Sequence, residues 1–185
     1  MNFSSATLHG IYQTPYLDAW IRNSVALSRP RRLWQFYQDA GYCVDRPQDV
    51  RLVPLVLREE RVSRLRKIFR LYIFAEMGVS TVMGPAAPFI GLPLLAMILL
   101  KWSIDIGWCY GLDMREKNIQ HEVGRIFTHR FSQVVWQRGY EGLTYRRLAT
   151  TATRLLLMGW GQELKWADQI TGKIRSELRR KLGEE

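Results

Sequence analysis

The hydrophobic pattern divides the chain into two amphipathic, charged ends and an apolar centre. Residues 77–100 contain no charged side chain and lie between Glu76 and Lys101. A run of this length can cross a bilayer as a helix, because about 20 apolar residues span the hydrocarbon core. Proline lacks a backbone N–H and disfavours helix in the residue before it. The prolines and glycines of this run therefore predict two helical arms joined by a bend over 84–92. These prolines and glycines are Gly78, Gly84, Pro85, Pro88, Gly91 and Pro93.

The second arm is predicted to begin at about Pro93, because proline suits the first turn of a helix. It is predicted to end near Tyr110, with Gly111 as the C-terminal cap. Lys101 and Asp105 lie four residues apart on this arm, so they are expected to form an ion pair on one helix face.

Two interpretations of this hairpin remain open from the sequence. In one, the arms enter or span a membrane, with the irregular bend buried in protein or at the midplane. In the other, they form the core of a helical bundle, whose central helices can be apolar on all sides. Asp105 weighs against a simple span, since a carboxylate in lipid is costly unless it is paired.

The N-terminal part predicts two short helices, over 15–27 and 30–41, followed by a linker over 43–54 that Pro47 and Pro54 interrupt. Aromatic side chains next to arginines mark the second of these helices. Aromatics and arginines occur together at membrane interfaces, whereas burial of aromatics in the core is their commoner role. Core packing is therefore the expected role of the group Leu33, Trp34, Phe36 and Tyr37.

A long helix is predicted over 55–81. Its three- and four-residue spacing places Val62, Leu65, Phe69 and Tyr72 on one apolar face. The basic residues on the other side are Arg64, Arg66, Lys67 and Arg70. This face either is solvated or lies against anionic headgroups, where each cation contributes about 1 kcal/mol.

The C-terminal part predicts a helix over 114–138 and a last helical region over 143–182. The stripe of the last region consists of Leu164, Ala167, Ile170, Ile174, Leu178 and Leu182. No strand set or repeat is visible, so the predicted fold class is all-α, a helical bundle around the central glycine- and proline-interrupted hairpin. We expect a single domain over 1–185, in which 1–54 holds the short helices and linker, 55–112 the basic-to-apolar helix and the hairpin, and 113–185 the basic C-terminal helices.

The net charge of +10 predicts an acidic partner, either an anionic lipid surface or nucleic acid. Both ends of the chain are basic and the centre is not. The two cysteines, Cys43 and Cys109, are too few for a disulfide framework and favour a reducing compartment. The first residues lack the charged start and apolar run of a secretory signal.

The chain carries no motif of catalytic or cofactor-binding chemistry. His121 and His129 share a helix face with Arg125 between them, and this cation opposes a metal ion. The glycines of the apolar centre have no lysine beside them to hold phosphate, and neither cysteine lies in a nucleophile motif. We therefore expect no enzyme activity, no cofactor and no metal.

A resemblance starts from the run Gly84-Pro85 to Gly91-Leu92-Pro93-Leu94-Leu95, followed by Ile104 and Tyr110-Gly111-Leu112-Asp113. These residues resemble the central part of the EcsC family, in which a glycine-rich apolar hairpin leads into a helix that closes with a Tyr-Gly-aliphatic-Asp turn. The pattern is also similar to the hydrophobic domain of some membrane-linked GTPases. It covers about 40 residues, with more proline and fewer glycines in the bend than the family has. The resemblance implies a bacterial, membrane-associated helical protein and transfers no active site.

Together these patterns predict a non-catalytic accessory or scaffold protein on the cytoplasmic side of a membrane, which binds anionic lipid or a membrane complex. The alternatives are an integral subunit of a larger membrane assembly and a helical nucleic-acid-binding protein. The residues expected to contact lipid or a partner are Arg64, Arg66, Lys67, Arg70, Phe89, Ile90, Leu94 and Leu95.

Overall fold

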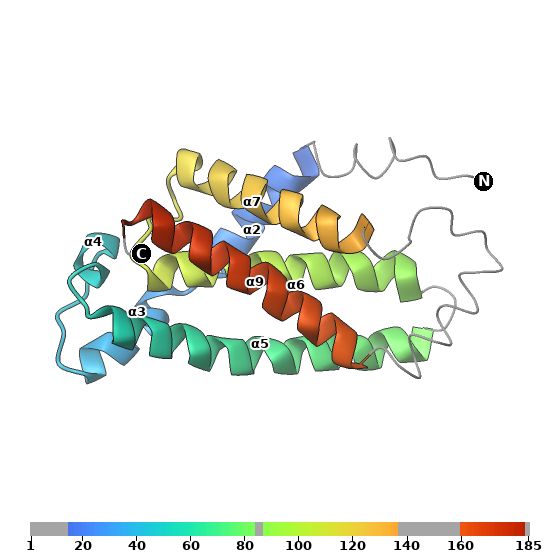
Figure 1. Cartoon of the computed structure of the whole chain (residues 1–185), viewed down its shortest axis with the longest axis horizontal. Helices are drawn as coiled ribbons and strands as arrows, with labels where there is room; N and C mark the ends of the chain where they lie inside the picture. Colours follow the sequence, from blue (N-terminus) through green and yellow to red (C-terminus); the bar gives the residue numbers. More distant parts are fainter. Residues whose placement is uncertain (1–14, 84–86, 137–159, 184–185) are drawn as a thin grey trace.

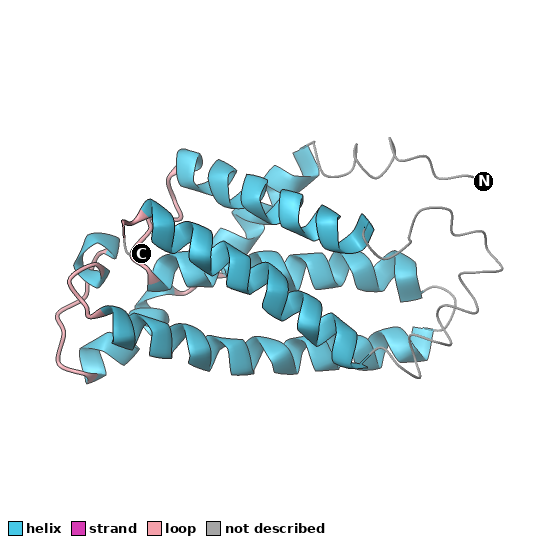
Figure 2. Cartoon of the chain, in the orientation of Figure 1, coloured by secondary structure: helices cyan, strands magenta, loops and turns pink. Residues whose placement is uncertain are grey.

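The computed structural model describes residues 15–83, 87–136 and 160–183. Within these ranges the chain forms seven helices and no strand (Figure 2), so the predicted all-α class is confirmed. The helices are α2 (Pro15–Leu27), α3 (Pro30–Asp39), α4 (Pro47–Val50), α5 (Leu55–Met83), α6 (Ala87–Cys109), α7 (Lys117–Trp136) and α9 (Trp160–Lys181).

Helix α6 lies at the centre of the arrangement. Helix α5 runs beside it, and the contact between these two helices is the most extensive among the described helices. Helix α9 crosses both diagonally, while α7 and α2 cover the remaining sides (Figure 1). Because α6 touches five other helices, it contributes more buried apolar side chains than any other described helix.

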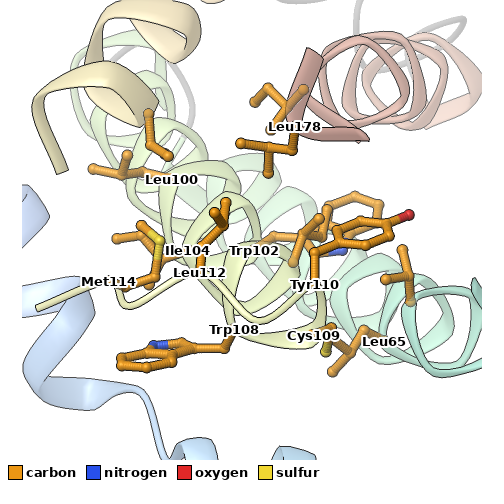
Figure 3. Close-up of a cluster of buried hydrophobic side chains, with 14 of the residues drawn as sticks. Leu65, Leu100, Trp102, Ile104, Trp108, Cys109, Tyr110, Leu112, Met114 and Leu178 are labelled. Atoms are coloured by element: carbon orange, nitrogen blue, oxygen red, sulfur yellow. The ribbon is translucent and has the colours of Figure 1, made fainter. Parts of the chain in front are cut away.

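The second half of α6 is buried on all sides. Figure 3 shows its side chains and those of the following turn together with Leu65 of α5 and Leu178 of α9. Residues 99–100 and 102–112 are all buried, including the polar Ser103 and Asp105. No helix in the described ranges has both the length and the apolar character needed to cross a membrane.

The C-terminal end of α6 is closed by a Schellman motif. The Leu112 N–H donates to the Gly107 carbonyl at 3.0 Å, and the Gly111 N–H donates to the Trp108 carbonyl at 3.2 Å. Gly111 has a φ of +78°, a conformation that residues with a Cβ rarely adopt. The predicted helix end and its glycine cap are confirmed.

Aromatic side chains of α3 satisfy further carbonyls at this helix end. Trp34 Nε1 donates to the Trp108 carbonyl at 3.2 Å, and the Tyr37 hydroxyl donates to the Cys109 carbonyl at 3.0 Å. Both aromatic side chains are buried, and Trp34 also packs edge-on against the Trp108 ring. These two aromatics therefore serve the core, as expected.

Helix α5 buries one continuous face, as its spacing predicted, with one correction. Val62, Leu65 and Phe69 are buried, and Phe69 stacks on Trp102 of α6. Tyr72 was expected on this face but is 55% exposed, and Ile73 is buried in its place. At 100° per residue, position 73 lies closer to the line through 62, 65 and 69 than position 72 does.

Two segments that were predicted to be irregular contain helix instead. Helix α6 begins at Ala87 rather than at Pro93, so much of the expected bend is helical. Pro88 suits this first turn, where an N–H has no intrahelical partner, and Pro93 lies in the helix interior. The expected linker over 43–54 contains the one-turn helix α4, which starts at Pro47 and is held by the Asp49 carboxylate accepting from the Arg46 N–H at 2.9 Å.

The two C-terminal helices follow the predicted pattern within the described ranges. Helix α7 begins at Lys117, three residues after the expected start, and Val123, Ile126 and Phe127 face the core. In α9 the predicted stripe is buried at Ala167, Ile170, Ile174 and Leu178, and Leu164 and Leu182 at its ends are partly buried. The predictions for 137–159 lie outside the described residues.

We expect Gly111→Ala to destabilise the protein by about 2 kcal/mol or more. The substitution forces a side chain into positive φ, which costs about 1–2 kcal/mol, and its Cβ would lie 2.5 Å from the Pro47 carbonyl oxygen. The measurement is the free energy of unfolding from a denaturant titration.

Gly172→Ala is the matched control for this prediction. Gly172 is an exposed helical position in α9 with open space around it. This change should stabilise the fold by about 0.5–1 kcal/mol, because alanine is the better helix former. Equal effects of the two substitutions would contradict the role of Gly111 in closing α6.

Candidate functional site

The four basic residues of α5 that were predicted to contact lipid headgroups lie outside its buried face, but they contact different neighbours. Arg64 pairs with Glu60 at 2.7 Å, and its guanidinium lies over the Phe36 ring of α3. Arg66 and Arg70 face α9. Lys67 is exposed between these two groups. The expected basic cluster is thus spread around the outside of the helix.

Arg66 and Arg70 share one carboxylate, that of Asp168 on α9. Arg66 forms a bidentate pair, with Nε 2.7 Å from Oδ1 and Nη2 2.6 Å from Oδ2, and Arg70 Nη2 reaches Oδ2 at 2.5 Å. Burial alone would raise the pKa of Asp168, but the hydrogen bonds and charges of the two arginines outweigh it and hold the pKa below its usual value. Asp168 therefore remains ionised and neutralises part of the positive face.

An exposed apolar strip runs along the other side of α5. It consists of Ile68, Leu71, Tyr72 and Ala75, which are exposed and lie at the spacing of one helix face. Leu71 is 68% exposed. Arg64 precedes Ile68 by four residues and Lys67 precedes Leu71 by four, so cations border the strip. The strip lies on the side of α5 opposite to Arg66 and Arg70.

The predicted apolar contact residues of α6 divide into three cases. The side chains of Phe89 and Ile90 lie outside the described residues. Leu94 is 37% exposed, so it is available at the surface. Leu95 is 3% exposed and belongs to the core of the chain itself.

The predicted pair of Lys101 and Asp105 is present, with Nζ 2.5 Å from Oδ2. Ser28, just before α3, hydrogen-bonds to the other carboxylate oxygen at 2.8 Å. Burial raises the pKa of Asp105, although Lys101 and Ser28 oppose this shift. The group is a buried polar link between α6 and the connection from α2 to α3, and its role is structural.

A second carboxylate, Glu59 of α5, joins three helices. It forms ion pairs with Arg175 and Arg179 of α9. It also accepts a hydrogen bond from the hydroxyl of Tyr110 at 2.7 Å. Glu59 is 18% exposed, close to the 22% of Asp168, so the two carboxylates are about equally shielded from solvent, and Glu59 differs in the tyrosine hydroxyl that it also binds.

Sequence reasoning did not identify Asp168 or Glu59. Asp168 lies 102 residues from Arg66, and no periodicity connects positions on two helices so far apart. The apolar strip could have been found, because Ile68, Leu71 and Tyr72 stand at helical spacing outside the line of Val62, Leu65 and Phe69.

No three His, Cys, Asp or Glu side chains in the described part of the chain converge in a way that could hold a metal ion. Both cysteines are free thiols: Cys43 is exposed, and burial raises the pKa of Cys109 to about 12. A thiol with this pKa is not a nucleophile at neutral pH.

Comparison with known proteins finds no match to this chain among family models, curated proteins or solved structures.

The two carboxylates that bind α9 are expected to differ in their contribution to stability. Glu59→Gln should cost about 2–3 kcal/mol, because the buried Tyr110 loses a charged hydrogen-bond acceptor and two arginines lose their shared counter-charge. Asp168→Asn should cost about 1 kcal/mol or less, since its carboxylate binds two arginines that are 40% and 48% exposed, and solvent screens these pairs. Denaturant unfolding of both variants measures the difference, and an equal or reversed order would contradict it.

Proposed function

We propose that the chain is a non-catalytic accessory or scaffold protein that attaches peripherally to an anionic membrane, on its cytoplasmic side, through the outer face of α5. The observation that carries this proposal is the exposed apolar strip of Ile68, Leu71, Tyr72 and Ala75 bordered by Arg64 and Lys67. An apolar helix face with basic residues at its edge is typical of helices that lie in the plane of a membrane interface.

Both physical contributions to membrane attachment are available on this face. Basic residues near an anionic surface contribute about 1 kcal/mol each. Insertion of a leucine-sized side chain adds about 2 kcal/mol, because apolar area leaves water. Each contribution alone gives weak, reversible binding, and their sum gives stable attachment.

The charge of the chain and a family resemblance also support the proposal. The net charge of +10 favours an anionic partner, and both ends of the chain are basic. The resemblance of the apolar centre to the EcsC family is in keeping with a membrane-associated protein. In this proposal α5 and α6 are the two arms of the central hairpin of a helical bundle; α6 serves as the core, and α5 presents the contact face.

We expect Leu71→Asn to weaken binding to anionic vesicles about tenfold or more, and Lys67→Gln to weaken it about fivefold, from the contributions of apolar insertion and of one cation. The measurement is co-sedimentation of the purified chain with vesicles of phosphatidylcholine mixed with phosphatidylserine, and with phosphatidylcholine alone.

The chain offers matched controls for both variants. Leu52→Asn changes a leucine that is 82% exposed in the turn after α4, and Lys173→Gln changes an exposed lysine of α9. Neither should alter vesicle binding by more than about twofold, because neither lies on the outer face of α5. Equal loss with a control and its test variant would contradict attachment through this face.

Other outcomes would point to the alternative functions. Retention in the membrane through an alkaline wash would indicate an integral subunit. Absence of vesicle binding together with steeply salt-dependent binding to DNA or RNA would indicate a nucleic-acid-binding protein.

A further inference from the structure

The contact between α5 and α9 has the chemistry of an anion-binding site. Two guanidinium groups converge on one carboxylate, and Arg66 holds it with two parallel hydrogen bonds. Arginine forks bind phosphate in the same bidentate way. Lys67 lies next to Arg66 in sequence and three residues before Arg70, and it is exposed. Two cations therefore face α9 at this contact, and Lys67 lies between them and the apolar strip.

The carboxylate does not satisfy every donor of this group. Arg70 Nε is buried and has no hydrogen-bond acceptor among the described residues. The two oxygens of Asp168 already accept from Arg66 Nε, Arg66 Nη2 and Arg70 Nη2. A tetrahedral phosphate offers more acceptor oxygens than a planar carboxylate, so it can serve a donor that Asp168 leaves without a partner.

Helix α9 does not depend on Asp168 for its position. Its buried stripe of Ala167, Ile170, Ile174 and Leu178 packs on the core, and Glu59 binds its C-terminal half. The arginines that pair with Asp168 are 48% and 40% exposed, so solvent screens these ion pairs and their contribution to stability is small. The arginines can therefore exchange this carboxylate for another anion while α9 stays in place.

We propose that Arg66 and Arg70 form a binding site for a phosphate group, and that Asp168 occupies this site as an internal counter-anion. The ligand chemistry is that of a phosphomonoester, whether on a lipid headgroup or free in solution. Because the site lies on the opposite side of α5 from the apolar strip, a chain attached to a membrane through the strip would bind a phosphomonoester in solution, whereas binding of a lipid headgroup would require the other side of α5 to face the membrane. Asp168 lowers the affinity of the site, so that weak anions do not fill it.

The test is the variant Asp168→Asn, which keeps the size of the side chain and one acceptor oxygen for Arg66. We expect it to bind glycerol phosphate about tenfold more tightly than the wild-type chain in a calorimetric titration, because the competing charge is removed. An equal gain for vesicles that contain phosphatidic acid would assign the phosphate to a lipid headgroup, and a gain for glycerol phosphate alone would assign it to a soluble ligand. Asp39→Asn is the control, since Asp39 is an exposed aspartate on α3 and its substitution makes the same change in net charge.

Two double substitutions complete the design. In the Asp168→Asn background, replacing Arg66 and Arg70 by Gln should remove the whole gain. In the otherwise wild-type chain, the same two replacements should weaken glycerol phosphate binding about tenfold, which tests the site independently of how Asp168→Asn folds. Equal gains with Asp168→Asn and Asp39→Asn, or a gain that survives loss of both arginines, would overturn the proposal.

The two ligands also separate this site from the proposed membrane attachment. Tighter binding of glycerol phosphate without any vesicle binding would support the phosphate site and contradict the membrane function. Vesicle binding that Asp168→Asn leaves unchanged, with no gain for glycerol phosphate, would overturn the site and leave membrane attachment intact.

Discussion

The carbonyl groups at the buried C-terminal end of α6 must find hydrogen-bond donors inside the protein. The elements around this helix end are held in place by the donors that they supply. Buried carbonyls without partners are costly. The Schellman motif at Gly111 satisfies those of Gly107 and Trp108, and the side chain of Tyr37 satisfies that of Cys109. Trp34 adds a second donor to the Trp108 carbonyl. Helix α3 is therefore held against the end of α6 by directional bonds as well as by packing.

A second consequence of burying α6 concerns α5. Because α6 occupies the centre, α5 has one face in the core and a wide face outside it. The outside divides into a side that α9 covers with Asp168 and a side where the apolar strip remains exposed. Arg66 and Arg70 are consequently balanced by Asp168, while Lys67 and the strip are presented outward. The proposed membrane contact and the proposed phosphate site are two sides of the same helix.

The two carboxylates that receive arginines at this interface differ in their partners. Glu59 links α5, α6 and α9, because it binds the hydroxyl group of the buried Tyr110 as well as two arginines of α9. The carboxylate of Asp168 binds the two arginines of α5, whose side chains are 40% and 48% exposed. Exposed ion pairs exchange readily with ions in solution, whereas loss of a charged group that holds a buried partner is costly. This difference assigns Glu59 to the attachment of α9 and leaves Asp168 able to yield its place.

The sequence by itself determined the all-α class, the position of most helices, the buried stripe of α9, the cap at Gly111 and the pair of Lys101 with Asp105. Each of these follows from local spacing: helical periodicity, a glycine after an apolar helix, or two charges four residues apart. Only the tertiary structure decided that α6 begins at Ala87. It alone brought Asp168 to Arg66 and Arg70, because contacts between helices far apart in the chain depend on packing that no local pattern encodes. The sequence identified the cations of α5, but which of them face another helix and which face outward followed from where α9 lies.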